Sequence, residues 1–316
     1  MAPIEHDKRP VESRRSFLQI TCRAAAAFAT AAVVPPFIQD LIPPEGEIPT
    51  EWLVSNPEQI ALLLNTPSFW TDRRPNSQRV LAGQLDPSQY TDYDSSDPEI
   101  NTACGSSVLL TWLNVCKTLK EGMPSEMRIA DVISQLRSAT YEVNPGGRRY
   151  PFLETNGSMY PLAVAEALNY FDPDHALYEA FIPCELMSPG SRDLYYSYAS
   201  LPYIKTFADS IFALGGAVIV GGIKYNAGHF AMMTALRFDT NAGLWRGNFI
   251  DPRGMMDNDI YGQVLTDVSW GNFWNNAFGI RTLLLGVIGV VPTIPVLTAE
   301  ARQAIKQQEP IPYIPL

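Results

Sequence analysis

Residues 103–119 read ACGSSVLLTWLNVCKTL. Apolar side chains recur in this stretch at every third or fourth position, which predicts a helix with one buried face. Those side chains belong to Val108, Leu109, Trp112, Leu113, Cys116 and Leu119. Small residues open the stretch, and Cys104 stands where the helix is expected to begin. The segment therefore predicts a core-forming helix with a cysteine at its N-terminal end.

Further helices are predicted around this one, and strands dominate after Gly216. The helices are expected at 56–65, 125–139, 161–170, from 172 onward and at 203–214, and the strands at 217–223, 229–238, 244–250 and 280–290. The polar turn at 239–243 joins two of these strands in a hairpin. Helices first and antiparallel strands afterwards are typical of an α+β fold, in which the 103–119 helix packs on a C-terminal antiparallel sheet.

The composition favours a folded domain with no nucleic-acid partner. With 46% hydrophobic and 18% charged residues, the 316-residue chain has enough apolar material for a large core. Its net charge of −10 gives it no electrostatic attraction for a phosphate backbone.

The N-terminal residues differ in character from the rest of the chain. Residues 13–18 read SRRSFL, and an alanine-rich, nearly uncharged run follows at 24–32. An arginine pair before a modestly apolar run resembles a twin-arginine export signal. The resemblance implies that residues 1–34 engage the twin-arginine export machinery and that the protein is exported, whereas an ordinary amphipathic helix on a cytoplasmic protein is the alternative.

The remaining chain divides into three parts. Residues 35–79 form a proline-rich linker with a short helix, 80–290 a single domain with a helical insertion at 140–215, and 291–316 a proline-rich C-terminal tail. The apolar run 283–297 contains Pro292 and Pro295 and is shorter than the roughly twenty residues that a bilayer requires. We therefore expect no stable membrane span after removal of the signal.

Cys104 is the candidate nucleophile. Unpaired backbone N–H groups and the positive end of the helix dipole favour a thiolate at a helix N-terminus. Gly105 and Ser106 carry little bulk, so we expect them to leave the sulfur open to a substrate carbonyl. A buried structural cysteine is the alternative.

His229 and Asp251 are the candidate base and its carboxylate partner. His229 is a lone polar residue at the start of an apolar strand, and Asp251 ends the following strand. A hairpin between these strands brings the two side chains together. A base held by a carboxylate and facing a thiol is the arrangement that nucleophilic catalysis requires.

The order Ala-Cys-Gly, Gly-His-Phe and Asp-Pro along these elements resembles papain-like cysteine peptidases. The likeness is greatest to the branch of bacteriocin-processing leader peptidases and their secreted, transporter-free relatives. It implies a papain-like fold over 80–290, an aromatic-rich helix near 268–274, and Gln89 as a side-chain donor in the oxyanion hole. Gln84 and Asn101 are alternatives to Gln89, and this chain has Ser106 where such relatives usually carry proline.

The expected activity is that of an exported thiol hydrolase that cleaves peptide or amide bonds in a peptide or protein substrate. The same triad also serves cell-wall peptide amidases and acyl transferases, and an inactive papain-like binding or structural domain is a further alternative. Because the chain has few histidines and no clustered cysteines, we expect no metal and no cofactor. Cys116 and Cys184 form either a disulfide or two buried thiols.

Overall fold

The computed structural model describes residues 57–73, 79–142, 148–172, 177–180, 193–213, 215–224, 227–255, 261–274 and 284–292. Its helices are α3 (Pro57–Leu64), α4 (Pro67–Thr71), the 3₁₀ turn η3 (Pro87–Gln89), α5 (Pro98–Thr102), α6 (Cys104–Glu121), α7 (Ile129–Arg137), α8 (Pro161–Phe171), α9 (Asp193–Ala213) and α10 (Trp270–Phe273). Its strands are β1 (Thr140–Glu142), β2 (Arg149–Pro151), β3 (Leu177–Ala180), β4 (Ala217–Lys224), β5 (Ala227–Asp239), β6 (Leu244–Met255), β7 (Tyr261–Ser269) and β8 (Leu284–Val290).

A six-stranded sheet of order β3-β8-β4-β5-β6-β7 forms the centre of the molecule. Every neighbouring pair in it is antiparallel, and β1 and β2 form a separate hairpin. The predicted α+β class with an antiparallel sheet is thus confirmed.

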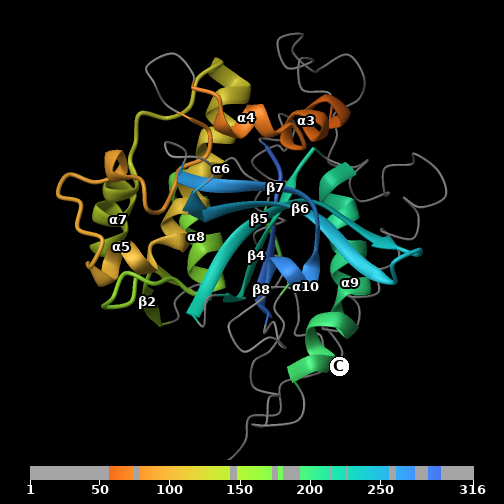
Figure 1. Cartoon of the computed structure of the whole chain (residues 1–316). Coiled ribbons are helices and arrows are strands. Elements are labelled where there is room, and N and C mark those ends of the chain that lie inside the picture. The colour runs from red at the N-terminus through yellow and green to blue at the C-terminus, as the bar shows by residue number, and fades with distance from the viewer. Residues whose placement is uncertain are drawn as a thin grey trace, which may run out of the picture.

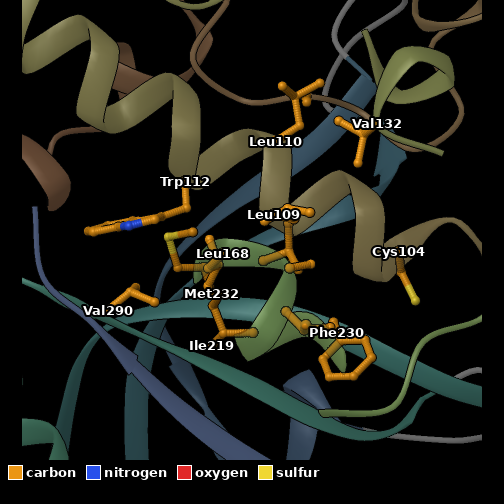
Figure 2. Close-up of a cluster of buried hydrophobic side chains, with 14 of the residues drawn as sticks. Cys104, Leu109, Leu110, Trp112, Val132, Leu168, Ile219, Phe230, Met232 and Val290 are labelled. Carbon is orange, nitrogen blue, oxygen red and sulfur yellow. The ribbon is translucent and has the colours of Figure 1, made fainter. Parts of the chain in front are cut away.

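Helices cover both faces of the sheet: α6 and α8 lie on one side and α9 and α10 on the other (Figure 1). Side chains alternate between the two faces along each strand. Ile219, Phe230, Met232 and Ile250 accordingly pack with α6 and α8, whereas Val218, Val220, Ala231, Met233 and Phe249 pack with α9 and α10. Figure 2 shows the cluster between the sheet and helices α6 and α8, with Cys104 at the N-terminal end of α6.

Helix α6 carries the predicted apolar face into this core. Leu109, Leu110 and Trp112 have no exposed surface. The helix begins at Cys104 and ends at Glu121, and it is capped by Gly122, whose left-handed backbone (φ 77°) suits the C-terminal cap of a helix.

Two helix starts and one additional strand differ from expectation. Helix α7 begins at Ile129 and not at Ser125, since Asp131 accepts a hydrogen bond from the Arg128 N–H and so caps the later start. Helix α9 begins at Asp193, with Pro202 in its interior, although a proline favours a helix start. Strand β7 was not predicted, because it lies at the edge of the sheet and is only partly buried.

Several predictions fall outside the described residues. They include the export signal, the proline-rich linker before Pro57, the proline-rich tail after residue 292, and Cys184. The helix expected from residue 172 onward is wrong where the structure describes it, because residues 177–180 form strand β3, which pairs with β8 at the edge of the sheet. Within the described ranges, no helix has the length and apolar character needed to cross a bilayer.

Candidate active site

Cys104 is the first residue of α6 and lies mostly buried. Its Sγ is 3.8 Å from the carbonyl oxygen of Thr102 and 3.9 Å from that of Gly228. The second contact joins the beginning of the helix to the beginning of β5. The thiol therefore lies where the helical and strand halves of the fold meet.

The small residues after Cys104 have a different role from the one expected. A Cβ atom added to Gly105 would lie 3.0 Å from the side chain of Met159. The Ser106 hydroxyl is fully buried and donates to the Met159 sulfur at 3.7 Å. Gly105 and Ser106 thus make room for Met159 and do not open the thiol to solvent.

His229 and Asp251 lie side by side on β5 and β6, as expected for neighbouring strands. The Nε2 atom of His229 is 2.7 Å from Oδ1 of Asp251, and both side chains are buried. The backbone N–H of Arg253 also donates to Oδ1, at 2.9 Å. The carboxylate is therefore fixed by its own strand as well as by the histidine.

The His229 ring also interacts with Cys104. Although burial lowers it, the hydrogen bonds and charges of Asp251 and Cys104 raise the pKa of His229 to about 9. Because Nε2 is bonded to Asp251, Nδ1 is the ring nitrogen left for the thiol. Cys104, His229 and Asp251 thus form a connected chain of three groups.

Lys224, at the end of β4, contacts the other oxygen of the same carboxylate. Its Nζ lies 2.5 Å from Oδ2 of Asp251, and its side chain is only 6% exposed. Burial lowers the pKa of Lys224, and the neighbouring carboxylate opposes this effect. Burial raises the pKa of Asp251, but the hydrogen bonds and charges of His229 and Lys224 leave it below its ordinary value.

Aromatic rings of α10 and of the residue that follows it cover this polar cluster. Lys224 Nζ lies 3.7 Å from the centre of the Phe273 ring. Gly222 pairs with His229 across the sheet, and a Cβ atom on it would lie 2.8 Å from the Trp274 ring. Only a glycine at this position lets the indole approach so closely. The rings keep water away from the ion pair, which strengthens its electrostatic interactions.

The two glutamines named from the sequence lie in different environments. Gln84 is fully buried, its backbone N–H donates to the Pro252 carbonyl at 2.7 Å, and its Nε2 donates to the carbonyls of Ile100 and Asn101 at 3.0 and 2.8 Å. It therefore links the residues before Cys104 to the strand that carries Asp251. Gln89 Oε1 instead accepts from the Ile129 N–H, so its side chain supports the start of α7.

The third amide named from the sequence, that of Asn101, is engaged with its own loop. Its Nδ2 donates to the carbonyls of Ser95 and Asp97 at 3.0 and 3.1 Å. Of the three, Gln84 is thus the residue held between α5, which precedes Cys104, and β6.

Among the described residues, no group of three or more His, Cys, Asp or Glu side chains is arranged to hold a metal ion. Cys116 is buried on α6, whereas His6 and His175 lie outside the described ranges.

Comparison with known proteins gives no relative for this chain. No protein-family model, no curated protein and no solved structure matches it.

Proposed function

We propose that this protein is a cysteine hydrolase with a papain-like fold over 80–290 that cleaves peptide or amide bonds. The observation that carries the proposal is the buried chain of Cys104, His229 and Asp251. These groups come from a helix N-terminus and two adjacent strands. A nucleophile, a base and a group that orients the base are the three parts that covalent acyl transfer requires.

The first half of the reaction forms an acyl-enzyme. His229 accepts the thiol proton at Nδ1, and the Cys104 sulfur attacks the carbonyl carbon of the substrate. The resulting C–S bond replaces the C–N bond when the tetrahedral intermediate collapses, and His229 returns its proton to the departing amine. Asp251 holds the imidazole by Nε2 throughout, which fixes its tautomer and its orientation.

The second half of the reaction releases the acid. Water gives a proton to His229 and attacks the thioester, and the thiol is regenerated when the C–S bond breaks. Both tetrahedral intermediates carry an oxyanion that needs hydrogen-bond donors. The backbone N–H of Cys104 is one donor. Gln84 Nε2 is the other, and it gives up one of its two carbonyl contacts to bind the oxyanion. Gln84 thereby takes the role that the family resemblance implies for Gln89.

Export through the twin-arginine machinery, by the signal at 1–34, belongs to the same proposal, as does a peptide or protein substrate. An acyl transferase or a cell-wall amidase would use the same three groups with a different acceptor or substrate.

Thiol labelling tests the nucleophile before any substrate is identified. We expect iodoacetamide to alkylate Cys104 faster than Cys116 in the folded full chain, as read by mass spectrometry of the peptides. The Cys104→Ala variant should lose both this labelling and the hydrolysis of a peptide library, while Cys116→Ala retains them. Equal labelling of the two thiols, or hydrolysis by Cys104→Ala, contradicts the proposal.

A further inference from the structure

A triad of thiol, imidazole and carboxylate has no chemical need for an amine, yet Lys224 is buried against its carboxylate. A lysine side chain loses its hydration when it is buried, which is unfavourable unless the charge is paired. The charged partner seen for Lys224 is Asp251, and the Phe273 ring covers its ammonium group. The position of this lysine is therefore tied to the carboxylate of the active site.

The two oxygens of Asp251 serve two different partners. Oδ1 faces His229 and accepts from the Arg253 N–H, whereas Oδ2 receives the Lys224 ammonium group. A carboxylate held at both oxygens cannot turn about its Cβ–Cγ bond. The contact between Lys224 and Oδ2 thereby fixes the plane of the carboxylate in which Oδ1 faces the imidazole.

The charges of the cluster also balance. Asp251 and Lys224 together are neutral, so the cluster has no net charge whether the Cys104–His229 pair is thiol and imidazole or thiolate and imidazolium. Without Lys224 the buried cluster would carry one negative charge, which favours the imidazolium.

We propose that Lys224 is a positioning residue of this active site: it fixes the Asp251 carboxylate toward His229 and cancels its charge. This role rests on the proposed function of Cys104, His229 and Asp251. In this role Lys224 acts through the carboxylate and needs no contact with the substrate or the reacting atoms.

Loss of Lys224 should change the titration midpoint of His229 in one direction. The titratable groups seen to act on its ring are Asp251 from β6 and Cys104 from α6, and Asp251 in turn faces Lys224 from β4. Replacement of Lys224 by methionine leaves the charge of the Asp251 carboxylate uncancelled, so the carboxylate stabilises the imidazolium more strongly. The His229 midpoint should therefore rise by about one pH unit or more.

An NMR titration of the histidine ring in the full chain measures this midpoint directly. The chain has three histidines, so the His229 signal is assigned by its loss in His229→Gln. The matched control is Lys205→Met, since Lys205 is partly exposed on α9 and pairs with Asp209 at 2.6 Å. We expect Lys224→Met to raise the midpoint and Lys205→Met to leave it unchanged. An unchanged midpoint in Lys224→Met overturns the proposal.

A comparison in the Asp251→Asn background covers the case in which Lys224→Met alone does not fold. The double variant Lys224→Met/Asp251→Asn has no charge at either position, and such replacements are tolerated better than removal of one partner. We expect the same His229 midpoint in Asp251→Asn and in the double variant, because Lys224 acts through the carboxylate. A further shift of about one unit in the double variant overturns this role. Iodoacetamide labelling of Cys104 tests the proposed function separately, so the two failures are distinguishable.

Discussion

Replacement of Asp251 by asparagine removes the charge that holds Lys224 in the interior while it keeps the size of the side chain. Lys224 is 6% exposed, and its Nζ is 2.5 Å from the carboxylate. After the substitution, the lysine must either keep a buried charge without its anion or release its proton. The free energy of unfolding reports which of the two occurs.

The two costs have different dependences on pH. An uncompensated buried charge costs about 3–5 kcal/mol. Release of the proton costs about 1.4 kcal/mol per pH unit below the ordinary lysine pKa of about 10.4, which is about 4.6 kcal/mol at pH 7 and about 2 kcal/mol at pH 9. The smaller cost applies, so Asp251→Asn should destabilise the protein by about 3–4.6 kcal/mol at pH 7 and by at most about 2 kcal/mol at pH 9.

The destabilisation caused by Asp251→Asn should become smaller as pH rises, because the folded and unfolded states bind different numbers of protons. When Lys224 is neutral in the folded variant and charged in the unfolded chain, the unfolded chain binds more protons, and the stability of the variant rises with pH. The raised pKa of His229 also makes the difference in stability between the parent and Asp251→Asn smaller as pH rises. Its contribution to the parent's stability is complete below the unfolded pKa of about 6.5 and is lost as pH rises through the folded value.

Urea unfolding at pH 7, 8 and 9, followed by tryptophan fluorescence, measures the difference. The parent and the Asp251→Asn variant are compared in a Cys104→Ala background, so that no thiol at position 104 titrates. The matched control is Asp209→Asn, which removes the partly exposed partner of Lys205 and should cost about 0.5 kcal/mol or less at each pH. A stability loss for Asp251→Asn that is below about 1 kcal/mol at pH 7, or that is the same at all three pH values, would refute the buried ion pair.

Two further predictions concern the reaction. Hydrolysis should fall above pH about 9 as the His229 imidazolium is lost, because the pKa of His229 is raised to about 9. In Asp251→Asn this alkaline limit of hydrolysis should move to lower pH. An alkaline limit that stays in place contradicts the role of the carboxylate. Gln84→Ala should lower kcat by about 10²–10³, as expected for loss of an oxyanion donor, while Gln89→Ala lowers the melting temperature with little change in kcat. The reverse pattern would return the oxyanion role to Gln89.

The sequence was sufficient to predict that Cys104 begins a helix and that His229 and Asp251 lie side by side, because all three belong to strongly periodic elements. Asp251 was expected at the end of its strand, but β6 continues to Met255. The apolar face of α6 and the short turn between β5 and β6 are local signals, and they determine where these three residues lie. Strand pairing then follows from the hairpin, and with it the contact between His229 and Asp251.

Gln84 and Lys224 depend on contacts that local patterns do not disclose. The position of Gln84 is set by the hydrogen bond between its backbone and Pro252, which is far away along the chain. Lys224 precedes the polar residues Tyr225 and Asn226 in the sequence and is easily taken for a solvent-facing residue. The alternation of side chains along β4 could have predicted the burial of Lys224. Lys224 lies on the same face of the strand as Val220 and Gly222, the face that α9 and α10 cover.

The position of β8 has a consequence for biosynthesis. Among the described strands it is the last along the chain, yet it is inserted between β3 and β4. A nascent chain that has left the ribosome only as far as α10 exposes the unpaired edge of β4, and such edges are templates for pairing with other chains. The sheet that carries His229 and Asp251 is completed only when residues 284–290 emerge, so a chain truncated before them should aggregate rather than mature.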